Sequence, residues 1–98
     1  MTITQVKNGK QLTIAISGRL DSTSCGDFID FLDKNFTQDI QDLTLDFAEV
    51  DFISSKGLRV LVTLYKNLNG RKMQIINANT AVKEVFRLSS LLPIFNIQ

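Results

Sequence analysis

The spacing of apolar residues switches along this chain between a period of two and a period of about 3.6. Leu12, Ile14 and Ile16 alternate with more polar residues, as expected for a half-buried strand over residues 11–17. The next apolar residues recur at i, i+3, i+4, i+7 and i+11, on one helical face made of Cys25, Phe28, Ile29, Leu32 and Phe36. Alternation then returns at residues 43–47. Such switching predicts an α/β fold.

The remaining segments extend this order. The Asn8-Gly9 pair predicts a hairpin that joins a weaker strand over residues 2–7 to the strand over 11–17. Helices are expected over 55–69, ended by Asn69-Gly70, and over 81–88, capped by Thr80. Strands are expected over 72–77 and 94–97. Strands that alternate with helices predict a mixed, mostly parallel sheet with an N-terminal hairpin and right-handed crossover helices.

Composition limits the class of protein. The 98 residues fit a single domain over 1–98, and 44% apolar content supplies one core. The net charge is +1 with scattered Lys and Arg, which argues against direct nucleic-acid binding. No apolar run is long enough for membrane insertion, and the first residues do not resemble a signal peptide. The single cysteine, Cys25, is interpreted as a core residue in a cytoplasmic protein.

The sequence contains no histidine, which removes the commonest general base and metal ligand. No metal or cofactor is therefore expected. Ser55 and Lys56 are adjacent and point in different directions, so they do not form a catalytic pair. A capped surface helix explains Thr80 and Lys83. A small α/β enzyme or nucleotide-binding domain is the rival class, but no Gly-rich phosphate loop or carboxylate pair supports it, and we expect no enzyme.

Polar residues follow two of the predicted strands. Asp21 follows the strand over 11–17, and Ser54 and Ser55 follow the next strand. Ligands and partners gather at the carboxyl ends of parallel strands, so we expect these loops to form one surface. Either serine would also serve as a helix cap, Ser54 if the helix begins at Ser55.

The segment Asp51–Leu58, with an acidic residue, two apolar residues, a serine pair and Gly-Leu, resembles the signature loop of the STAS domain. This is the family of the anti-sigma factor antagonists. Gly18–Asp21 resembles the end of the family's second strand, and Ala81–Ser89 resembles its third helix. The resemblance extends from about residue 10 to about residue 97.

The resemblance implies a bacterial regulatory module that binds an anti-sigma factor serine kinase and thereby releases a sigma factor. The kinase would phosphorylate Ser55, and a metal-dependent serine phosphatase would restore the active form. The implied partner-binding residues are Asp21, Ser54, Lys56, Gly57, Leu58 and Arg59. Gly57 is expected to admit a partner's backbone, and Leu58 to begin the core face of the helix.

Two positions depart from the family pattern. Ser54 stands where the best-known members carry aspartate, and Lys56 stands where they usually carry a small residue. These departures favour an alternative, in which the domain is a non-phosphorylated STAS scaffold of a sensory assembly or a subunit of a membrane lipid-transport complex.

Family members commonly carry another helix after the last strand, and this sequence ends at Gln98 without one. We therefore expect one face of the strand over 94–97 to stay open for a partner subunit or for a second copy, in a homodimer. In the alternative, the helix over 81–88 and the segment 89–93 fold back over this strand.

Overall fold

The structure of the chain is a computed structural model, and it describes residues 1–90 and 95–97. Strands and helices follow one another in the predicted order within this part of the chain. They are β1 (Thr2–Asn8), β2 (Gln11–Leu20), α1 (Cys25–Asn35), β3 (Asp42–Ile53), α2 (Ser55–Lys66), β4 (Lys72–Ile76), α3 (Thr80–Leu88) and β5 (Asn96–Ile97).

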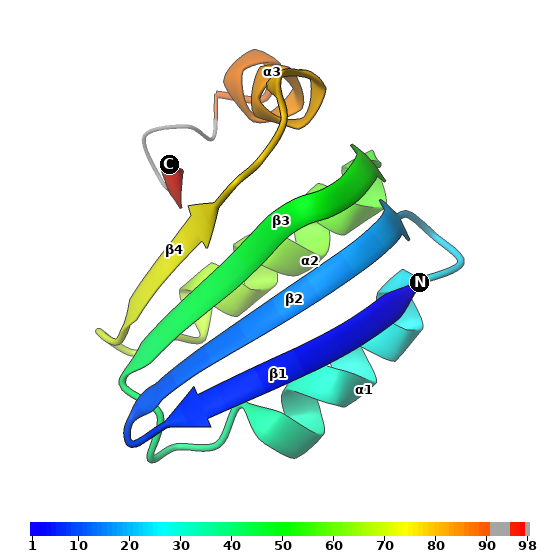
Figure 1. The fold of residues 1–98 in the computed structure, drawn as a ribbon. Coiled ribbons are helices and arrows are strands. Elements are labelled where there is room, and N and C mark those ends of the chain that lie inside the picture. The colour runs from blue at the N-terminus through cyan, green and yellow to red at the C-terminus, as the bar shows by residue number, and fades with distance from the viewer. Residues whose placement is uncertain (91–94, 98) are drawn as a thin grey trace.

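The strands of the described residues form a five-stranded sheet in the order β1-β2-β3-β4-β5. The β1–β2 pair is antiparallel, and the other neighbours are parallel. Figure 1 shows α1 and α2 behind the sheet and α3 beyond the ends of β3 and β4. The prediction of a mixed, mostly parallel sheet with an N-terminal hairpin is confirmed.

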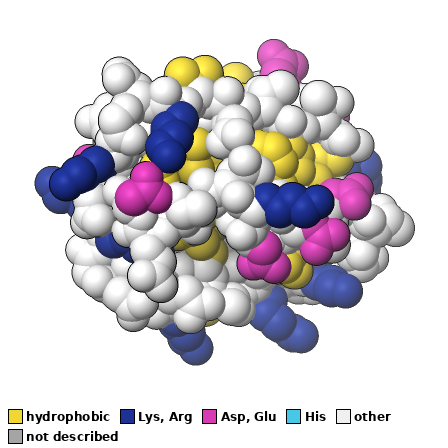
Figure 2. Space-filling view, turned by 90° about the horizontal axis from the view of Figure 1, so that it is seen from below, with side chains coloured by type: hydrophobic (Ala, Val, Ile, Leu, Met, Phe, Trp, Pro, Cys, Tyr) yellow, Lys and Arg dark blue, Asp and Glu magenta, His cyan; other side chains and the backbone are white. Residues whose placement is uncertain are grey.

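The core lies between the sheet and the helices behind it. Leu12 and Ile14 of β2 are buried beside their register partners Leu43 and Leu45 of β3, as strand alternation predicts. Phe28 of α1 is also completely buried in this cluster. Charges of both signs are interleaved around hydrophobic side chains on the face seen in Figure 2.

The hairpin turn lies one residue later than the sequence indicated. Asn8 is paired with Gln11, so the two central residues are Gly9 and Lys10. Gly9 has a φ of 62°, which glycine adopts without steric cost. The prediction of Asn8-Gly9 as the turn was therefore wrong by one position.

Two helix boundaries also differ from the prediction. Asn79, not Thr80, caps α3, because the Asn79 side chain accepts a hydrogen bond of 2.8 Å from the amide of Val82. The same side chain donates to the carbonyl oxygen of Val50 at 3.2 Å, which ties the cap to β3. Helix α2 ends at Lys66 rather than at residue 69.

The described part of the C-terminal segment is packed against two helices. Phe95 is only 4% exposed and makes edge-on contacts with Tyr65 of α2 and Phe86 of α3, at centroid distances of 5.8 and 5.6 Å. Phe95 is therefore covered by α2 and α3, as in the alternative in which α3 folds over this segment. Whether one face of the last strand is open stays a prediction. Ile94 and Gln98 lie outside the described residues. The homodimer stays a prediction.

Candidate functional site

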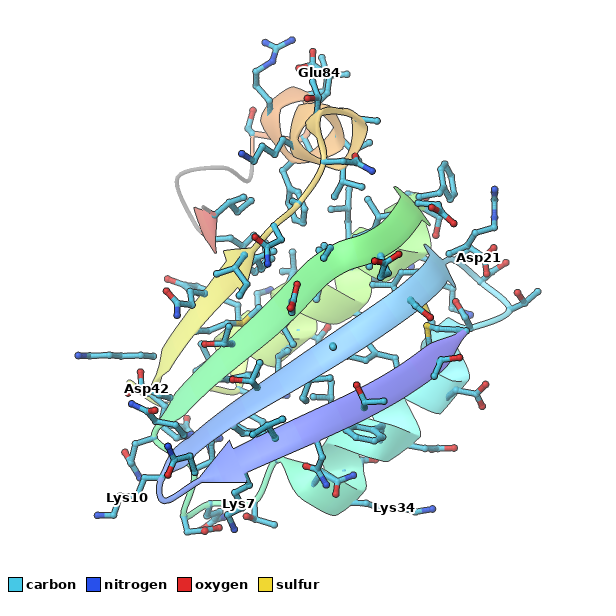
Figure 3. The ribbon with its side chains drawn as sticks, viewed as in Figure 1. Lys7, Lys10, Asp21, Lys34, Asp42 and Glu84 are labelled. Carbon is cyan, nitrogen blue, oxygen red and sulfur yellow. The ribbon has the colours of Figure 1, made fainter. Side chains whose placement is uncertain are left out.

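The loops after β2 and β3 meet at one end of the sheet. Leu20 and Ile53 are register partners there, and the amide of Ser54 donates a hydrogen bond of 3.0 Å to the carbonyl oxygen of Leu20. Figure 3 shows Asp21 at this end and Lys7 and Asp42 at the opposite one. The sequence-based expectation that the two loops would converge is met.

Helix α2 begins directly after the serine pair. Ser54 has extended backbone angles and is the N-cap, and its Oγ accepts a hydrogen bond of 3.1 Å from the amide of Gly57. Ser55 is the first helical residue and is exposed. Within residues 1–90 and 95–97, its hydroxyl has no hydrogen-bond partner. The question of which serine is the cap is thus answered: Ser54 caps, and Ser55 is free at the surface.

Gly57 is buried, and its lack of a side chain serves the packing of the domain itself. A Cβ atom at this position would lie 2.6 Å from the carbonyl oxygen of Leu20 and 2.9 Å from Cγ1 of Ile53. Glycine is therefore required so that the first turn of α2 can pack against the end of β2. The prediction that Gly57 leaves room for a partner's backbone gave the wrong reason.

Leu58 is 7% exposed and belongs to the hydrophobic core, as predicted for the start of the core face. Gly57 and Leu58 thus contribute little side-chain surface to a partner. The residues of the first turn that do reach solvent are Ser55, Lys56 and Arg59. Ser55 and Arg59 are four residues apart, so they lie on the same side of α2.

Lys56 also lies close enough to the start of α1 to act on Cys25. Burial raises the pKa of the Cys25 thiol, and the positive charge of Lys56 opposes this shift. Cys25 is completely buried, which confirms its interpretation as a core residue. The Lys56 side chain at the start of α2 therefore lies near the start of α1.

Asp21 organises the loop between β2 and α1. Its Oδ1 accepts hydrogen bonds from the hydroxyl of Thr23 at 2.7 Å and from the amides of Thr23 and Ser24 at 3.0 and 3.3 Å. Its Oδ2 accepts a bond of 3.4 Å from Nε of Arg19. These donors, the Thr23 hydroxyl above all, lower the pKa of Asp21 to about 2. The carboxylate therefore stays ionised and fixes the shape of its own loop.

Arg19 and Phe52 form a contact that sequence reasoning missed. They are register partners on β2 and β3, and the Arg19 guanidinium carbon lies 4.4 Å from the centroid of the Phe52 ring. Phe52 is 39% exposed. The sequence did contain a sign that Phe52 is exposed, because Phe52 directly precedes the buried Ile53. Strand alternation places neighbouring side chains on opposite faces of the sheet.

The described residues, 1–90 and 95–97, hold no group of three or more His, Cys, Asp or Glu side chains able to bind a metal ion. None of the helices in this part of the chain has the length and hydropathy needed to cross a bilayer.

The fold and the signature loop define a STAS domain, and the chain belongs to this family, because the STAS domain model matches residues 2–98. Among solved structures, an anti-sigma factor antagonist from Mycobacterium paratuberculosis superposes with a TM-score of 0.89 and 18% identity, over 98% of this chain and 83% of that one. A comparison with curated protein sequences gave no significant match.

Two further structures are of SpoIIAA, described as an anti-sigma factor antagonist and a Bacillus cell fate determinant. The unphosphorylated form gives a TM-score of 0.81 at 17% identity, over 99% of this chain and 88% of that one. The phosphorylated form gives 0.75 at 16% identity, over 99% and 91%. At these identities the similarity establishes the fold.

Proposed function

We propose that this STAS domain is a cytoplasmic anti-sigma factor antagonist, not an enzyme, that binds a kinase-type anti-sigma factor and is switched off by phosphorylation of Ser55. One observation carries the proposal. Ser54 caps α2, so the neighbouring Ser55 hydroxyl stays exposed and unbonded within the described residues. A metal-dependent serine phosphatase would return the protein to its active form. The similarity to both forms of SpoIIAA supports this proposal.

The domain itself tolerates a phosphate on Ser55. Phosphorylation adds a charge of about −1.5 to −2 and three acceptor oxygens. Ser55 is the first residue of α2, where the helix dipole and unpaired amides favour negative charge. The exposed cations of Lys56 and Arg59 lie in the same region. We therefore expect the fold to change little when Ser55 is modified.

The phosphate acts by weakening the complex with the partner. A partner surface that fits a neutral hydroxyl would have to desolvate a dianion after modification. A change from mostly bound to mostly free needs about 5 kcal/mol of differential affinity. An imperfectly paired phosphate within an interface supplies a penalty of that size.

The test is incubation with ATP and the cognate anti-sigma factor kinase, followed by mass spectrometry. We expect one added phosphate, located on Ser55 by peptide mapping. Ser55→Ala should remove phosphate incorporation and keep most of the partner affinity, whereas Ser54→Ala should still be modified. A phosphate found on Ser54 would disprove the assignment of the acceptor.

The second candidate function is a non-phosphorylated STAS scaffold of a sensory assembly or a subunit of a membrane lipid-transport complex. The exposed Lys56 beside Ser55 favours it, because the family usually has a small residue there. The same incubation distinguishes the two functions: a scaffold binds its partner without any gain in mass.

A further inference from the structure

A groove of about 780 Å³ is lined mainly by residues of α1 and α2. These are the two helices that lie behind the sheet in Figure 1. Its apolar lining comes from Ile29 and Leu32 of α1 and from Val60 and Leu64 of α2. We call this surface the helix groove. It adjoins the exposed start of α2, because Lys56 and Arg59 line it as well.

Ile29 is the clearest sign that the helix groove is unfilled. It falls on the apolar face of α1 that the sequence assigns to the core, yet it is 40% exposed. Its neighbour on that face, Leu32, is only 8% exposed. The apolar face of α1 is therefore only partly covered by the core, and its uncovered edge, at Ile29, lines the helix groove.

The charges that line the helix groove are unbalanced. The lining contains three cations, Lys56, Arg59 and Arg71, and one carboxylate, Asp33. No ion pair within residues 1–90 and 95–97 includes any of these three cations, because the ion pairs there join other residues. The groove therefore combines an apolar lining with an excess of uncompensated positive charge.

Arg71 is held rigidly in this arrangement. Its Nε donates to the carbonyl oxygen of Leu68 at 2.9 Å, and its Nη1 donates to those of Thr37 and Ile40, each at 3.1 Å. Its guanidinium also lies 4.2 Å from the centroid of the Phe36 ring. Its Nη2 donates to the carbonyl oxygen of Asn67 at 3.5 Å. These contacts fix the position of the charge at the edge of the groove without pairing it with a carboxylate.

We propose that the helix groove docks an amphipathic helix of a partner protein, with the apolar side of that helix on Ile29 and Val60. Acidic residues beside this apolar side face Lys56 and Arg59 on α2. Binding between two helices is an established way for a partner helix to bury its apolar stripe. The excess positive charge of the groove favours a partner helix that is rich in Asp and Glu. This contact is separate from the Ser55 switch and needs no phosphorylation.

The test uses two synthetic helical peptides and the whole chain. One carries Leu at i, i+3, i+4 and i+7 with Glu along its flanks, and the matched peptide has Lys in place of Glu. In a nuclear magnetic resonance titration, we expect the acidic peptide to shift the signals of Ile29 and Val60. The basic peptide should bind at least about tenfold more weakly.

Four variants complete the test. Ile29→Ser should weaken binding of the acidic peptide by about tenfold or more, because an apolar contact is lost. Arg59→Glu should weaken it by a similar factor, because the new carboxylate repels the acidic residues of the peptide. Lys83→Glu, on the exposed surface of α3, is the matched charge control and should have no such effect. Thermal melting of each variant verifies that it is folded. Ser55→Ala should bind the peptide normally, so this test succeeds or fails independently of the phosphorylation assay.

Each of the following results would overturn the proposal: absence of peptide binding, equal binding of both peptides, or signal shifts confined to the open face of the sheet. Sedimentation at several protein concentrations tests whether a second copy of this chain occupies the helix groove. A dimer that Arg59→Glu dissociates would assign the helix groove to self-association instead.

Discussion

The carbonyl oxygen of Leu20 lies 2.6 Å from the place where a side chain on Gly57 would begin. Gly57→Ala must therefore displace backbone, and we expect a loss of about 1–3 kcal/mol in the free energy of unfolding. Gly26→Ala in α1 is the control, because no atom lies within 4 Å of its added Cβ. It should gain up to about 1 kcal/mol from helix propensity. Urea denaturation of both variants measures these changes, and equal losses would contradict the packing role of Gly57.

Replacing each of the two serines at the start of α2 should change the free energy of unfolding by a different amount. Ser54→Ala removes the cap on the amide of Gly57, which should cost about 1 kcal/mol. Ser55→Ala removes an exposed hydroxyl and should change the free energy of unfolding by less than about 0.5 kcal/mol. Chemical denaturation at neutral pH decides between them. A larger loss for Ser55→Ala would mean that Ser55, not Ser54, is the cap in solution.

Asp21 makes the stability of the domain depend on acid pH. Its pKa is lowered from 3.8 to about 2 in the folded chain, chiefly by the hydroxyl of Thr23. A lowered folded-state pKa gives a stabilisation that is present above the unfolded pKa and is lost as pH falls through the folded one. This contribution should therefore disappear between about pH 4 and pH 2.

The measurement for Asp21 is a carboxyl titration by nuclear magnetic resonance, with an expected midpoint near 2. Thr23→Ala should move the midpoint toward the ordinary value of 3.8. In parallel, the difference in unfolding free energy between the natural chain and Asp21→Asn should shrink as pH falls over this range. A midpoint near 4 in the natural chain would show that the loop does not hold the carboxylate as described.

Hydrophobic spacing, together with turn and cap residues, was enough to predict the order of strands and helices, because each buried face repeats at its own period. Residues with local alternatives were harder to predict. Asn79 and Thr80 are both good caps, and the additional hydrogen bond from Asn79 to Val50 of β3 decides between them. That bond joins residues far apart in the sequence, so no local pattern contains it.

The candidate site divides in the same way. The position of Ser55 at the start of α2 followed from the signature loop, and the structure agrees. The burial of Gly57 against Leu20 and the contact between Arg19 and Phe52 did not follow. Both depend on the register between β2 and β3, which shifts between Gly18 and Arg19, and a single sequence does not reveal such an irregularity.

The last prediction concerns Phe95, whose ring lies against Tyr65 and Phe86. Because Phe95 is only 4% exposed, Phe95→Ala should cost about 3–5 kcal/mol in the free energy of unfolding, the usual range for a buried phenylalanine. Tyr65 is 44% exposed, so Tyr65→Ala should cost clearly less and serves as the control. Thermal and urea unfolding of both variants provide the comparison. If Phe95→Ala kept full stability while sedimentation showed that it dissociates a homodimer, the Phe95 ring would be a contact between copies rather than part of the core.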